Sequence, residues 1–267
     1  MIRETFALFF KRFVLFFLLA LLPSLALTAL SVVLMPLLVT EESILSLWPW
    51  LRLAVFGGLM LSITLIMMGS ISLAVYDVKM GRPIKLFSYL FNAMLAIPEI
   101  LVLGVLLSLM FALMAGAFIL FASIVPTTAL PLGLLLLFAA PLPWFYVTAR
   151  YMVFVPAVLV EGAGFRGLGR AATLSENYRW SIAGATFSLL VLTVLIALVI
   201  NLPFLAAIGF DFLVLPGVPI FTISSVLQSL ASAVQFALLS IFVALLYVRL
   251  REIKEGLGAE DISEVFR

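Results

Sequence analysis

Long apolar runs dominate the chain, and short polar segments separate them. Six runs are long enough to cross the hydrocarbon core of a bilayer as helices, which requires about 20 apolar residues each. These runs cover residues 13–39, 51–76, 94–122, 132–149, 181–208 and 221–248. The pattern predicts a single-domain, all-α integral membrane protein with six transmembrane helices.

Two local features refine this prediction. The segment TEESILSLWPW, residues 40–50, joins the first two runs, and its acids and tryptophans are typical of a short outer loop with an aromatic belt. Pro141 and Pro143 fall within the fourth run, and we expect them to interrupt that helix. The first run is longer than a signal-peptide core and has no clear cleavage site, so we interpret it as the first span.

Composition agrees with a lipid environment and argues against several kinds of chemistry. The chain is 66% hydrophobic and 10% charged, whereas soluble domains are about 45–50% apolar and about 25% charged. It contains no cysteine and no histidine, which removes thiolate nucleophiles and the commonest general base and metal ligand. We therefore expect a non-enzymatic protein with no catalytic residues, no metal site and no cofactor. No basic run of the nucleic-acid-binding kind is present.

The basic residues predict the orientation of the chain. Segments 1–12, 77–93, 150–180 and 249–267 hold 14 of the 15 lysines and arginines, and Arg52 is the exception. These four segments fall on one side of the predicted spans, which is the positive-inside pattern. Both termini are therefore predicted to be cytoplasmic.

Three stretches combine apolar and basic residues at helical spacing. They are RETFALFFKR from residue 3, IKLFSYLFNA from residue 84 and FRGLGRAATLSENYRW from residue 165. We expect short interfacial helices there, with their basic sides toward anionic lipid phosphates. Their spacing of roughly eighty residues suits either an internal repeat or any six-span protein with inner loops.

The third stretch supplies the candidates for lipid binding. Arg166, Arg170 and Arg179 flank its apolar positions and are candidate ligands for lipid headgroups. The alternative is that they only set topology and pair with Glu161 and Glu176.

Polar residues within or beside the predicted spans form a second candidate site. They are Glu99, Arg150, Asn201 and Gln228. Charges at membrane depth often mark pathways and usually pair inside the bundle. Alternatively, the two charged side chains reach interfacial water, and the two amides form hydrogen bonds between helices.

Glycines mark two further sites of backbone structure. GAGFRGLGR, residues 162–170, lacks the context of a phosphate-binding loop, and we interpret its glycines as allowing a sharp turn or close helix packing. In the tail, Gly256 permits a turn after the last span. We expect residues 259–267 to form a short helix that folds back on the inner surface.

Two segments resemble a known family. RYMVFVPAVLVEGAGFRGLGRAATLSENYRW, residues 150–180, and LLYVRLREIKEG, residues 245–256, are similar to the six-helix membrane domain of some bacterial glycerophosphodiester phosphodiesterases and to YciC-like inner-membrane proteins. The matching residues are Glu161, Gly162, Arg170, Arg179, Trp180, Tyr247, Leu250, Arg251, Glu255 and Gly256. The resemblance implies a bacterial inner-membrane bundle with inner termini. It does not imply phosphodiesterase activity, which belongs to a separate barrel of about 200 residues or more.

The charged residues of these two segments suggest an ion-pair network. Arg170, Arg179 and Arg251 can pair with Glu161 and Glu255 on one inner surface. Such a network would hold the inner loop against the tail, which is a structural role.

Three functions follow from these patterns. The leading hypothesis is a non-enzymatic protein that organises or contacts membrane lipids, anionic ones in particular, or a membrane-protein partner through a basic cytoplasmic face. The second is a transporter or lipid carrier with a polar site between broken helices. An intramembrane enzyme that uses carboxylates alone ranks last.

Overall fold

The computed structural model describes residues 1–38, 47–96, 98–102, 141–162, 164–208 and 218–256, with isolated positions between 105 and 116. Every described element is helical, which confirms the all-α prediction. The elements are α1 (Ile2–Lys11), α2 (Phe13–Leu38), α3 (Leu47–Lys79), α4 (Leu86–Leu95), α7 (Pro141–Tyr151), α8 (Phe154–Glu161), the 3₁₀ turn η2 (Gly164–Arg166), α9 (Gly167–Leu174), α10 (Arg179–Ile208) and α11 (Val218–Glu255).

Four of these helices have the length and apolar composition needed to cross a membrane. Their apolar parts are Phe13–Ser31, Val55–Lys79, Arg179–Val199 and Ser229–Glu255. They correspond to the first, second, fifth and sixth predicted runs. The protein is therefore a membrane protein with transmembrane helices. The predicted runs 94–122 and 132–149 lie mostly outside the described residues, apart from a helical segment at 98–102 and α7.

The structure corrects one predicted helix boundary. Helix α3 begins at Leu47, so Trp48 and Trp50 belong to its first turn and not to a loop. Helix α7 begins at Pro141, and the rest of the fourth run lies outside the described residues, so its predicted interruption stays a prediction. Pro49 of α3 and Pro141 of α7 both lie in a first helical turn. The first backbone N–H groups of a helix have no intrahelical acceptor, and proline there removes no hydrogen bond.

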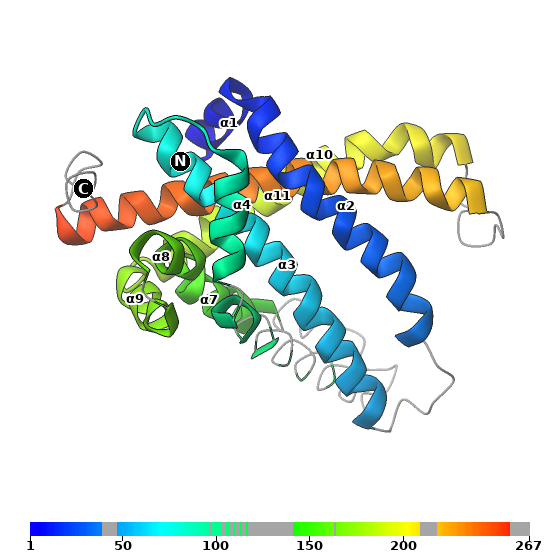
Figure 1. Ribbon diagram of the computed structural model, residues 1–267, viewed down its shortest axis with the longest axis horizontal. Coiled ribbons are helices and arrows are strands. Elements are labelled where there is room, and N and C mark those ends of the chain that lie inside the picture. The colour runs from blue at the N-terminus through cyan, green and yellow to red at the C-terminus, as the bar shows by residue number, and fades with distance from the viewer. Residues whose placement is uncertain are drawn as a thin grey trace, which may run out of the picture.

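Helices α2, α3 and α11 contact one another, and α10 packs on α11 and α7. Figure 1 shows the long helices diverging from an end where α1, α4, α8 and α9 gather. Small buried residues such as Ala20, Ala74 and Ala237 allow the three helices to approach closely. The hydroxyls of Thr28 in α2 and Ser229 in α11 lie 2.7 Å apart and form a hydrogen bond between the two helices.

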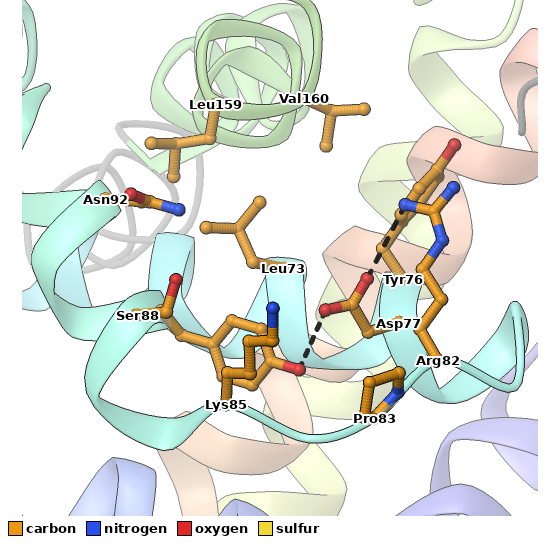
Figure 2. A pocket seen from close by; sticks show the side chains of 11 residues that line it. Leu73, Tyr76, Asp77, Arg82, Pro83, Lys85, Ser88, Asn92, Leu159 and Val160 are labelled. Atoms are coloured by element: carbon orange, nitrogen blue, oxygen red, sulfur yellow. Dashed lines mark hydrogen bonds and ion pairs between the residues drawn. The ribbon is translucent and has the colours of Figure 1, made fainter. Parts of the chain in front are cut away.

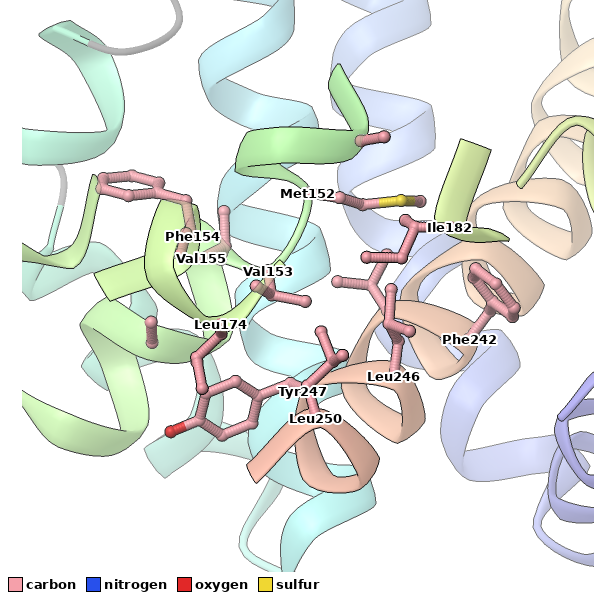
Figure 3. Close-up of a cluster of buried hydrophobic side chains, with 14 of the residues drawn as sticks. Met152, Val153, Phe154, Val155, Leu174, Ile182, Phe242, Leu246, Tyr247 and Leu250 are labelled. Carbon is pink, nitrogen blue, oxygen red and sulfur yellow. The ribbon is translucent and has the colours of Figure 1, made fainter. Parts of the chain in front are cut away.

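A second buried cluster fixes α8 at this end of the bundle. It joins residues of α3, α8, α9, α10 and α11, including Val153, Ile182 and Leu246 (Figure 3). Helix α9 lies so close to α8 that a Cβ atom on Gly167 would stand 2.6 Å from Cγ2 of Val158. The interpretation of the 162–170 glycines as packing and turn residues is confirmed, since Gly162 has a φ of +63° after α8.

Four basic segments meet at the end where the short helices gather. Helix α11 has 38 residues and is about 57 Å long at 1.5 Å per residue, well beyond the ~30 Å hydrocarbon core. Its last turns therefore extend to the short helices. An ion pair of 2.9 Å between Glu4 and Lys79 ties α1 to the end of α3. We call this region, residues 1–12, 77–93, 150–180 and 249–256, the basic end.

Candidate functional site

The predicted ion-pair network is present in part at the basic end, with two of its three arginines. Glu161 of α8 accepts hydrogen bonds from the Arg170 guanidinium of α9, with Nε 3.0 Å from Oε2, and from the Tyr247 hydroxyl of α11 at 2.7 Å. Arg251 Nε lies 2.9 Å from Glu255 Oε2 and 3.7 Å from Glu161 Oε1. Arg170 also pairs with Glu255. We call these five residues the charge cluster.

The charge cluster is compact and electrically balanced. Its two arginines and two glutamates cancel, and the Arg251 side chain is only 9% exposed. Burial alone would lower the pKa of Arg170, but its hydrogen bonds to Glu161 and Glu255 raise that pKa above its ordinary value. Partly buried charges of this kind are tolerated because each has a partner of opposite sign. The cluster holds α8, α9 and α11 together, which supports a structural role.

The three arginines predicted to bind headgroups lie in different environments. Arg170 is occupied in the charge cluster. Arg179 donates a hydrogen bond from Nη1 to the Tyr146 hydroxyl at 2.9 Å and so ties α10 to α7. It does not join Glu161 or Glu255, contrary to the predicted network. Arg166 is exposed and has no ion pair within the described ranges.

The predicted intramembrane polar site is not assembled among the residues that the structure describes. Glu99 lines a cavity of about 300 Å³ with Asn92 and Gly164, and its buried Oε2 has no hydrogen-bond partner among the described residues. The Arg150 guanidinium stacks 5.3 Å from the Tyr151 ring centroid. No ion pair joins Glu99 to Arg150 in the described part of the chain.

The other two members of that site lie on long helices. Asn201 belongs to α10 and Gln228 to α11. Their side chains fall outside the described part of the structure, so the predicted site stays a prediction at these positions.

A second polar cavity lies at the basic end between α3, α4 and α8. Its volume is about 360 Å³, and its polar lining includes Asp77, Arg82, Lys85, Ser88 and Asn92. Figure 2 shows Ser88 and Asn92 on the α4 side and Leu159 and Val160 on the α8 side. We call this cavity the groove.

The charges of the groove are only partly balanced. Asp77 accepts a hydrogen bond of 2.8 Å from the Tyr89 hydroxyl, and Arg82 Nη1 lies 3.9 Å from its other carboxylate oxygen. Burial and the hydrogen bond to Asp77 raise the pKa of Tyr89 to about 12, so the phenol remains a donor at neutral pH. Lys85 is exposed and forms no ion pair with any described residue. With one acid and two bases, the lining carries a net positive charge.

The sequence interpretation overlooked the groove, although a signal was present. Ser88 and Asn92 are four positions apart in a stretch that is otherwise mostly apolar. Polar positions at i and i+4 share one face of a helix. Lys85 was assigned to a predicted interfacial helix and Arg82 was counted as a topology signal, but neither was placed at a cavity.

Comparison of the chain with protein-family models, with curated proteins and with solved structures finds no match. The family resemblance therefore stays a prediction. Evidence for function comes from the geometry of the basic end.

Proposed function

We propose that this is a non-enzymatic, multi-pass membrane protein that contacts anionic lipids through the basic end, which faces the cytoplasm. The observation that carries this proposal is that exposed aromatic side chains lie beside basic residues that have no ion pair with any described residue, on or next to the short helices. In α4 the Phe87 side chain is 88% exposed, and it lies two residues after the unpaired Lys85. A large apolar side chain left open beside a cation suits the boundary between acyl chains and headgroups.

Two further segments repeat this combination. At the end of α1, Phe10 is 68% exposed and precedes the exposed Lys11 and Arg12. In η2, Phe165 is also exposed and precedes Arg166. Each basic residue near an anionic leaflet contributes on the order of 1 kcal/mol of attraction. The shared arrangement supports contact with lipid at several points of the same surface.

The full proposal includes six spans with both termini in the cytoplasm of a bacterial cell, at the inner membrane. Because the chain contains no cysteine, single cysteines can be introduced and labelled individually. We expect cysteines at positions 80 and 167 to be protected from a membrane-impermeant reagent in intact cells. Cysteines at 43, 127 and 216 should react. Labelling of position 167 from outside would contradict the orientation.

Lipid contact is tested by measuring the lipids that co-purify in mild detergent from membranes of known composition. We expect anionic phospholipids to be enriched over their share of the membrane, with the enrichment decreasing at high salt because screening weakens surface attraction. An unchanged lipid ratio would contradict the proposal. Proteins that co-purify in the same sample would identify a membrane partner.

A lipid carrier is the second candidate. It is favoured by the cavity at Glu99, which shares Leu73, Asn92 and Leu159 with the groove. A polar path from the surface into the bundle would suit movement of a headgroup. Reconstituted protein that accelerates transfer of fluorescent lipids between leaflets would establish this function, and a rate equal to that of empty liposomes would exclude it.

A further inference from the structure

We propose that the groove is a binding site for a single anionic, phosphate-bearing lipid headgroup, with Lys85 as its main cation. The inference rests on the proposed function and adds a defined site to a general basic surface. It starts from the polar groups that converge on the cavity, which Figure 2 shows.

Several polar side chains of the groove are available to a ligand. The Asp77 carboxylate is occupied by Tyr89 and partly by Arg82. The side chains of Lys85, Ser88 and Asn92 make no hydrogen bond or ion pair within the described part of the chain. An ammonium group, a hydroxyl and an amide together offer the donors that phosphate oxygens accept.

The position of the groove along α3 indicates its depth in the membrane. The apolar part of α3 ends at Lys79, and Leu73 and Asp77 from its last turns line the groove. Lipid phosphates lie where the hydrocarbon core ends. The groove is therefore at the depth of the headgroups and not in the aqueous phase.

The volume of the groove suits a lipid headgroup. A volume of about 360 Å³ is at the lower end of the range for small-molecule sites, and it has room for a headgroup but not for two acyl chains. The acyl chains would lie outside, along the exposed Phe87, Phe91 and Met94 of α4. Phe87 and Phe91 each precede one of the polar residues Ser88 and Asn92 by one position, or about 100° around the helix, so the acyl chains would run beside the polar face.

The charges near the two ends of α4 determine how the ligand is oriented. At the other end of this face of α4, the adjoining cavity contains the Glu99 carboxylate. Its negative charge repels phosphate, so the phosphate binds at the end with Lys85 and Arg82. The first turn of α4 begins beside Lys85 without a side-chain cap, and its free N–H groups add a favourable partial charge.

The test compares two variants that each remove one exposed, unpaired cation from the same end of the protein. Lys85→Gln removes the proposed ligand, and Arg249→Gln is the matched control outside the groove. Native mass spectrometry of the full chain in detergent, titrated with dioleoyl phosphatidylglycerol, measures the affinity. Dioleoyl phosphatidylcholine and inorganic phosphate are titrated in parallel.

We expect one molecule of phosphatidylglycerol to bind more tightly than the rest. Lys85→Gln should weaken this binding about tenfold or more, as loss of a charged hydrogen bond does. Arg249→Gln should change it less than about twofold, since a surface charge outside the site acts only at long range. Both variants should retain the unfolding midpoint of the unsubstituted protein. Ser88→Ala should weaken binding about threefold, consistent with loss of a weaker hydrogen bond.

The other outcomes separate failure of the site from failure of the proposed function. Equal losses in Lys85→Gln and Arg249→Gln would overturn the groove site and leave the basic surface intact. Absence of any preference for phosphatidylglycerol over phosphatidylcholine would overturn both proposals. If inorganic phosphate displaces phosphatidylglycerol at an equal concentration, the groove binds a soluble phosphate compound, and the lipid assignment is overturned. If Lys85→Gln unfolds, Ser88→Ala takes its place in the test. An unchanged affinity of Ser88→Ala for phosphatidylglycerol would overturn the site.

Discussion

The charge cluster and the groove lie at the same end of the protein and use similar side chains, yet they differ in how their charges are balanced. In the charge cluster, Arg251 and Arg170 each contact both Glu161 and Glu255. In the groove, Asp77 has internal partners, whereas Lys85 has no anionic partner among the described residues. One set of charges is complete within the protein, and the other can be completed by a ligand.

This difference separates stability from binding. A charge removed from a closed, partly buried network leaves its former partners uncompensated, so the fold is destabilised. A charge removed from an open cavity leaves nothing uncompensated, so only ligand binding changes. Substitutions in the two regions should therefore affect different measurements.

The largest expected effect is that of Arg251→Gln. It leaves Glu161 and Glu255 with only Arg170 as a cation, and we expect a loss of about 3 kcal/mol in the free energy of unfolding in detergent. Arg249→Gln is the control, because Arg249 is exposed on the same helix and should change stability by less than about 0.5 kcal/mol. Equal effects would show that the charge cluster is not a stabilising unit.

The second effect tests the packing that brings Arg170 into the charge cluster. Gly167→Ala places a methyl group against Val158 of α8, and we expect a loss of about 2 kcal/mol from overpacking. Gly169 lies in the same helix with open space at its Cβ position. Gly169→Ala should therefore be neutral or stabilise by up to about 1 kcal/mol through helix propensity. The same denaturant titration measures both variants, and a reversed order would contradict the observed approach of α9 to α8.

The third effect belongs to the groove and should appear in binding. Asp77→Asn keeps an oxygen that can accept the Tyr89 hydrogen bond but removes the one acidic charge of the lining. A unit charge at this range contributes on the order of 1 kcal/mol, so we expect phosphatidylglycerol to bind about fivefold more tightly. Native mass spectrometry provides the measurement. Unchanged or weaker binding would argue that no anion occupies the groove.

The smallest effect is expected at Glu99. Its buried Oε2 has no hydrogen-bond partner among the described residues, so Glu99→Gln removes an unpaired charge and should stabilise the fold, by no more than about 1 kcal/mol. A loss comparable to that of Arg251→Gln would reveal an ionic partner for Glu99. In that case the predicted intramembrane polar site would regain support.

Much of the fold could be predicted from the sequence because membrane helices follow from local rules. The apolar run that begins at residue 13 corresponds to α2, and the run that ends at residue 208 corresponds to α10. In each helix one boundary differs from the prediction by one or two residues. Lipid offers no partner for backbone groups, so an apolar run of sufficient length has to satisfy them within a helix. The starts of α3 and α7 were less predictable because proline and tryptophan suit either a loop or a first helical turn.

The candidate sites depended on information that lies beyond local sequence. Arg166, Arg170 and Arg179 have the same chemistry and lie within 14 positions of one another, yet one is exposed, one is in the charge cluster and one binds Tyr146. Their environments differ because Arg170 meets Glu255, which is 85 residues away in the chain. No local pattern specifies that meeting.

The sequence by itself determined that the chain is helical and suited to a membrane, and that its basic residues fall in four segments. Tertiary structure alone decided which of those residues are paired and which remain open to a ligand. The physical reason is the separation along the chain over which each interaction acts. Helix formation and hydrophobic length are summed over neighbouring residues, whereas an ion pair needs two side chains within about 4 Å. At the basic end that distance is set by how α8 packs between α3, α9 and α11.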